Sequence, residues 1–148
     1  MGLDQYLHVT KYCSDYSNKD MQKKILALFP DIPKSTNMGS VEVTIEIGYW
    51  RKANAIHKWF VDNVQDGEDN CATYSVSRED LIKLKALCEK VLKDHAKAAE
   101  LLPGQEGFFF GGSEYDKWYF ENLKDTIKII NKCLALDKDY YFEYHSSW

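Results

Sequence analysis

Alternating apolar and polar side chains predict four β-strands along the chain. They cover residues 3–12, 41–47, 73–76 and 140–147. The second is the clearest, because four β-branched residues (Val41, Val43, Ile45, Ile47) alternate with Glu42, Thr44 and Glu46. One face of the sheet is therefore expected to be wet or to meet a cationic group.

Apolar positions at helical spacing predict four α-helices between these strands. The first follows a cap at Ser17 or Asn18 and ends at Pro30, and the others cover residues 51–64, 77–102 and 113–134. Ser77 and Ser113 are the predicted N-caps of the last two, each with an aspartate three residues later. The predicted core stripes are, in order, Met21, Ile25, Leu28 and Phe29; Ala53, Ile56, Phe60 and Val64; Leu81, Leu84, Leu87, Cys88 and Val91; and Tyr119, Leu123, Ile127, Ile130 and Leu134.

These elements predict a single α+β domain over residues 1–148. The strands alternate apolar and polar positions, which is typical of an antiparallel sheet with one solvated face. A doubly wound parallel sheet would instead show continuous apolar strands. We expect a mostly antiparallel sheet of about four strands, packed by about four helices on one face.

Composition and charge restrict the function classes. The net charge is −4 and arginine occurs twice, at Arg51 and Arg78, which disfavours direct nucleic-acid binding. The chain has no signal-peptide pattern and no apolar run of membrane-spanning length. Its four cysteines are far apart in sequence, as expected for reduced thiols in a cytoplasmic protein.

The densest group of binding-type residues lies where the second strand pattern meets the second helix pattern. We predict Tyr49, Trp50, Arg51, Asn54 and His57 as ligand- or partner-binding residues. A helix starting near Arg51 would offer free backbone N–H groups to an anion, with a tryptophan to stack on a flat group. The competing interpretation is structural: the tryptophan is in the core, and Asn54 and His57 hold neighbouring backbone.

The segment Gly104–Ser113 is a second candidate surface. It lacks the Lys-Ser/Thr of a P-loop, so the glycines point to unusual backbone conformations rather than to a phosphate site. Three consecutive apolar residues cannot all face a core, so we predict that Phe108, Phe109 and Phe110 contribute a partner contact. No pair of ligand-type residues has zinc-site spacing and no nucleophile motif is present, so we predict no metal and no cofactor.

Several strings resemble a family of small, uncharacterised proteins of bacteriophages, prophages and their bacterial hosts. They include Gly2–Leu7, Gly48–His57, Leu101–Pro103, Gly107–Gly111 and Ser146–Trp148. The resemblance covers nearly the whole chain and implies no known activity, cofactor or catalytic residue. It implies a context, because accessory proteins of this kind often block host defences or redirect host proteins.

Three functions remain open from the sequence. The leading one is a non-enzymatic binding protein that engages a host protein or a small anionic ligand. In one version, Glu42, Glu46 and the acidic turn 66–69 imitate phosphate charge and occlude a nucleic-acid-binding partner. The first alternative is a small enzyme acting on a nucleotide-like or phosphorylated metabolite, with His57 as acid or base. The second is a structural homo-oligomer subunit that buries the aromatic surplus between copies.

Overall fold

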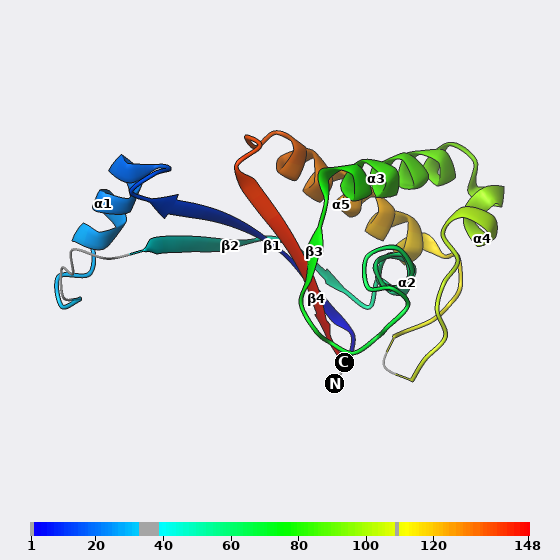
Figure 1. Ribbon diagram of the computed structural model, residues 1–148. Coiled ribbons are helices and arrows are strands. Elements are labelled where there is room, and N and C mark those ends of the chain that lie inside the picture. Colours follow the sequence, from blue (N-terminus) through cyan, green and yellow to red (C-terminus); the bar gives the residue numbers. More distant parts are fainter. Residues whose placement is uncertain (1, 33–38, 109) are drawn as a thin grey trace.

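The computed structural model describes residues 2–32, 39–108 and 110–148. In this part of the chain, four strands form one antiparallel sheet in the order β2-β1-β4-β3. The two terminal strands pair at its centre, so both chain ends lie at the same edge of the molecule (Figure 1). The strands are β1 (Asp4–Ser14), β2 (Ser40–Arg51), β3 (Tyr74–Val76) and β4 (Tyr140–Ser147).

The described residues also form five α-helices, and together the elements make a single α+β domain with an antiparallel sheet, as predicted. The helices are α1 (Lys19–Ala27), α2 (Asn54–Asn63), α3 (Arg78–Lys93), α4 (Ala98–Leu101) and α5 (Lys117–Leu134). A short 3₁₀ turn, η1 (His95–Lys97), precedes α4. Helices α2, α3 and α5 lie on one side of the sheet, and α1 lies apart from them (Figure 1).

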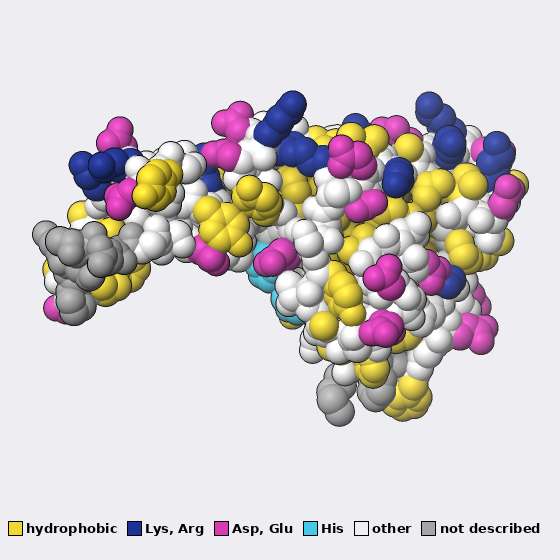
Figure 2. Space-filling view, viewed as in Figure 1, with side chains coloured by type: hydrophobic (Ala, Val, Ile, Leu, Met, Phe, Trp, Pro, Cys, Tyr) yellow, Lys and Arg dark blue, Asp and Glu magenta, His cyan; other side chains and the backbone are white. Residues whose placement is uncertain are grey.

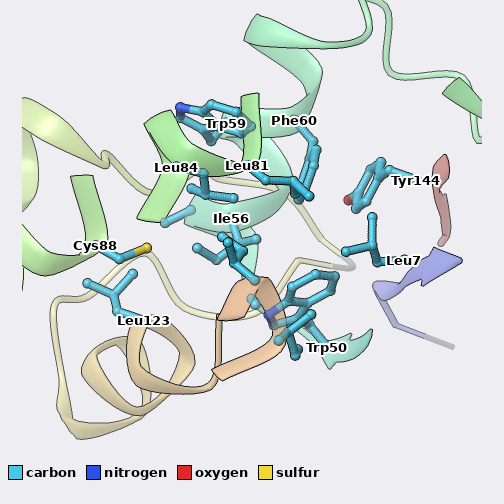
Figure 3. Packing of buried hydrophobic residues seen from close by; sticks show 14 of the residues in the cluster. Leu7, Trp50, Ile56, Trp59, Phe60, Leu81, Leu84, Cys88, Leu123 and Tyr144 are labelled. Carbon is cyan, nitrogen blue, oxygen red and sulfur yellow. The ribbon is translucent and has the colours of Figure 1, made fainter. Parts of the chain in front are cut away.

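The core fills the space between the sheet and these three helices. Ile56 and Phe60 of α2 lie at its centre and are fully buried. The sheet contributes inward-facing residues from alternate positions, as the pleat requires. Figure 3 shows this packing, with Leu7, Trp50 and Tyr144 from the sheet, Leu81, Leu84 and Cys88 from α3, and Leu123 from α5.

Strands β1 and β2 extend beyond the rest of the sheet as a two-stranded arm with α1 at its tip (Figure 1). Pairing of β1 with β4 ends at Lys11, whereas its pairing with β2 continues to Ser14. The predicted core stripe of α1 is wrong, because Met21, Leu28 and Phe29 are exposed and the buried residue is Gln22. The helix contacts a narrow ribbon rather than a layered core, so its apolar residues are not enclosed.

The junction between β2 and α2 also differs from the prediction. Residues 49–51 were expected to lead into a helix at Arg51, but β2 continues to that residue. They pair with residues 4–6 of β1, and these ladder bonds fix the segment as strand. Lys52, with a positive φ of 56°, then turns the chain, and α2 begins at Asn54.

Two helix boundaries are corrected as well. The helix expected over residues 77–102 stops at Lys93, because Asp94 is extended and its side chain caps the following 3₁₀ turn. The last long helix is capped by Asp116, whose side chain accepts from the N–H of Tyr119, rather than by Ser113. The capping box of Ser77 and Asp80 is confirmed.

Gly48 lets the sheet and α5 approach closely. The β1–β2 register shifts between Leu7 and His8, which pair with Gly48 and Glu46, so Ile47 is the extra residue of a bulge. Gly48 therefore faces the helices. A Cβ added there would lie 2.5 Å from Cγ2 of Ile129 on α5.

Replacing Gly48 by alanine is expected to lower the free energy of unfolding by about 1–3 kcal/mol, because the buried side chain of Ile129 must move to admit the methyl group. Chemical denaturation would measure the change. Gly39→Ala is the matched control, since a Cβ there meets nothing within 4 Å. A Gly48→Ala protein as stable as this control would contradict the close approach of β2 and α5.

Candidate functional site

The structure separates the residues predicted at the β2–α2 junction into two groups. Trp50 points into the core and is 3% exposed, and its Nε1 donates a 2.9 Å hydrogen bond to Oγ1 of Thr126. Tyr49 and Arg51 lie on the opposite face of the strand, where Arg51 pairs with Asp4 at 3.7 Å. Because side chains alternate along a strand, these three neighbours do not form one site.

Asn54 holds the segment that follows Gly107 against the start of α2. Its Nδ2 donates to the carbonyl oxygens of Gly112 (2.6 Å) and Phe110 (3.3 Å), and the side chain is buried. Phe110 is 8% exposed, and Phe108 is 96% exposed. Phe109 lies outside the described residues. The phenylalanine segment therefore divides into a residue anchored in the body and a residue at the surface.

His57 lies within a continuous chain of buried hydrogen bonds. Nε2 of Gln5 donates to the carbonyl oxygen of Ala53, which leaves Oε1 of Gln5 to accept from the hydroxyl of Tyr144 at 3.0 Å. The oxygen of Tyr144 must then accept from Nδ1 of His57, which lies 2.8 Å away. On its other side, Nε2 of His57 lies 2.9 Å from Oδ2 of Asp69.

Both ring nitrogens of His57 are therefore occupied by partners within the protein, Nδ1 by Tyr144 and Nε2 by the Asp69 side chain. His57 and Tyr144 are each 0% exposed. Burial, followed by the charge of Asp69, raises the pKa of Tyr144 well above 10. The other oxygen of Asp69 accepts from Nε1 of Trp148. The arrangement fastens the 66–71 turn and the C-terminal residue to the body, and it offers a substrate no access to His57.

A cleft of about 350 Å³ opens beside the start of α2. It lies between residues 51–56, the glycines at 111–112 and the first turns of α5. Ala53 gives the helix no side-chain cap, so backbone N–H groups face this region. The rim carries Arg51 and Lys52 but also Glu114 and Asp116, so its charges balance.

The face of the sheet opposite α2, α3 and α5 carries a second group of polar and aromatic residues, and no helix of the described part covers it. We define this open face by residues that share one side of three neighbouring strands: Tyr6, His8 and Tyr12 of β1; Glu42, Glu46 and Tyr49 of β2; and Tyr141, Glu143 and His145 of β4. In Figure 2, histidine (cyan) and acidic (magenta) side chains lie beside hydrophobic ones (yellow) where the arm meets the body. The yellow class includes tyrosine.

Aromatic rings on the open face support one another. The rings of Tyr6 and His145 are stacked at 4.8 Å, and those of His8 and His145 at 5.2 Å with planes 5° apart. Tyr12 and Tyr141 meet edge to face at 5.4 Å. Burial, followed by the charge of His8, lowers the pKa of His145 below its ordinary value.

The open face is acidic. His8 lies between two carboxylates, because it pairs with Glu46 on β2 and with Glu143 on β4. Within the described residues, neither of these nor Glu42 takes part in an ion pair. The charge of Glu42, followed by burial and the charge of Glu143, raises the pKa of Tyr12. The hydroxyl of Tyr12 therefore lies in a region of negative electrostatic potential.

Sequence reasoning missed much of this surface. Tyr6, Tyr12 and Tyr141 were not predicted as site residues, although each occupies a polar-side position of a predicted strand. His8 and His145 lie on neighbouring strands, and their rings are stacked. Among the described residues, however, no group of three or more His, Cys, Asp or Glu side chains has an arrangement that could hold a metal ion.

Comparisons with protein-family models, with curated proteins and with solved structures find no match to this chain. None of the helices in the described ranges is long and apolar enough to cross a membrane.

Proposed function

We propose that this protein is a non-enzymatic, phage- or prophage-type accessory binding protein that engages a host protein through its open face. The observation that carries the proposal is an uncovered sheet face bearing exposed tyrosines. The resemblance of the chain to phage-associated proteins supports a host protein as the partner, and interference with a host defence is a role of that kind.

The composition of the open face supports protein binding. Tyr12, Tyr49 and Tyr141 are 42%, 45% and 55% exposed, although each is anchored on a strand. Tyrosine is enriched in protein interfaces, since it contributes a large contact area and a hydroxyl at a low entropic cost. Tyr12 and Tyr141 pack edge to face, and the hydroxyl of Tyr49 donates to Asp4, so binding would require little further ordering of these side chains.

The other two ligand hypotheses have less support. The enzyme hypothesis assigned acid–base chemistry to His57, which is fully buried with both ring nitrogens bonded within the protein. The small-anion hypothesis needs a cationic pocket, and the cleft beside α2 carries Glu114 and Asp116 opposite its two cations. Both observations favour a macromolecular partner.

Quantitative affinity capture from a bacterial host lysate tests the proposal, with Tyr12→Ala/Tyr141→Ala compared with wild type. We expect wild type to retain a host protein at fixed stoichiometry and the double variant to bind it at least about tenfold more weakly. Phe29→Ala/Trp118→Ala removes two exposed aromatic residues from other surfaces and serves as the control. Equal capture by all three proteins, or capture of no protein by wild type, would contradict the proposal.

A further inference from the structure

We infer that the occupant of the open face is an arginine- and lysine-rich protein surface of the kind that otherwise binds nucleic-acid phosphates. This inference rests on the proposed function and adds the chemistry of the partner. It draws on the order of charged and aromatic groups across the three strands that form the face.

The strand register arranges the open face in rows. The row nearest the arm tip pairs Tyr12 with Glu42. In the next, Thr10 lies between Thr44 and Tyr141, and the threonine hydroxyls are 2.8 Å apart. In the third, His8 lies between Glu46 and Glu143. The exposed ring of Tyr12 therefore lies beside Glu42, and that of Tyr141 is followed along β4 by Glu143.

This combination fits cationic side chains. Carboxylates form charge-assisted hydrogen bonds with guanidinium groups, often through two bonds at once. A tyrosine face attracts the same cation through its ring quadrupole. The carboxylates of Glu42, Glu46 and Glu143 have no ion-pair partner within the described residues, so a bound cation would displace none.

The charge also decides between two classes of partner. Some RNA-binding domains stack bases on aromatic residues of an open antiparallel sheet, so the rings by themselves fit RNA as well. Three carboxylates among those rings would repel the phosphates of a nucleic acid. Arg51, the cation on this face, lies at the far end beside Asp4, with which it forms an ion pair. The acidic rows thus favour a basic protein over a nucleic acid.

Titration with a nine-arginine peptide tests this inference directly. We expect saturable binding to wild type, with amide NMR shifts centred on residues 8–12, 42–46 and 141–145, and with affinity that falls as salt increases. The variant Glu42→Gln/Glu46→Gln/Glu143→Gln is expected to bind about tenfold more weakly. Glu79→Gln/Glu89→Gln/Glu106→Gln removes three carboxylate charges from exposed positions outside the open face and should bind like wild type.

Each other outcome would overturn the inference. If both triple variants bind the peptide equally weakly, binding depends only on the net charge of the protein and not on the open face. Binding of a single-stranded oligonucleotide at the open face would assign a different partner, and a concentration-dependent dimer formed through this face would assign a second copy. If the peptide does not bind but Tyr12→Ala/Tyr141→Ala still loses its host protein, the basic partner is wrong and the proposed function stands. If both fail, neither stands.

Discussion

Replacing His57 by alanine is expected to lower the free energy of unfolding by about 3–5 kcal/mol. The variant removes the side chain that contacts both Asp69 and the buried hydroxyl of Tyr144, and it leaves a cavity in the place of the imidazole ring. A buried polar group that loses its hydrogen-bond partner retains its full desolvation cost. The expected loss thus exceeds that of an ordinary truncation on the same helix.

Urea denaturation followed by circular dichroism would measure this loss. Lys58→Ala is the control, because it removes the next side chain of α2, whose surface ion pair with Asp62 contributes at most about 1 kcal/mol. The double variant His57→Ala/Asp69→Asn should lose less stability than the sum of the two single variants, because the two side chains contact each other. Additive effects of the two substitutions would contradict a stabilising contact between them.

The role of His57 illustrates why the site was only partly predictable from sequence. A buried hydrogen-bond network and a ligand site use the same residue types, so the dense group from Tyr49 to His57 fitted both. The difference lies in strand alternation: Trp50 faces the core because β2 continues to Arg51. The structural interpretation, in which Trp50 is in the core and Asn54 holds backbone, describes these two residues correctly.

The open face could be anticipated only in outline. The polar alternation of residues 42, 44 and 46 predicts a solvated sheet face, and this is confirmed. The sequence does not contain the pairing of the two terminal strands, which brings His8 between Glu46 and Glu143. Register depends on contacts between distant segments, so a site assembled from three strands is hidden until the topology is known.

Predictions from local sequence patterns are correct where interactions between neighbouring residues determine the structure. β4 covers the predicted residues, and Ser77 and Asp80 form the predicted capping box. They are wrong where contacts between distant segments determine which residues are buried. The apolar stripe of α1 is exposed at the tip of the arm, because helical periodicity reports which face is apolar but not whether a layer exists to cover it.

The second large effect is expected at Phe60, which joins α2 to the centre of the sheet. Its ring is fully buried and stacks on Tyr144 with centroids 3.9 Å apart and planes 10° apart. It also meets Trp59 edge to face at 5.3 Å. Truncation to alanine removes these contacts and leaves a cavity, so Phe60→Ala should cost about 3–5 kcal/mol.

Phe108→Ala is the matched control, because both variants remove a phenyl ring and differ only in whether that ring is buried. Phe108 is 96% exposed, so its truncation should change stability by no more than about 0.5 kcal/mol. The melting temperature should therefore fall by roughly 10 °C for Phe60→Ala and hardly at all for Phe108→Ala. Because Phe60 supports β4, the Phe60→Ala variant should also lose partner binding at temperatures where it unfolds. If Phe108→Ala instead loses partner binding with no change in melting temperature, part of the interface lies outside the open face. Similar melting temperatures for the two variants would contradict a core centred on Phe60.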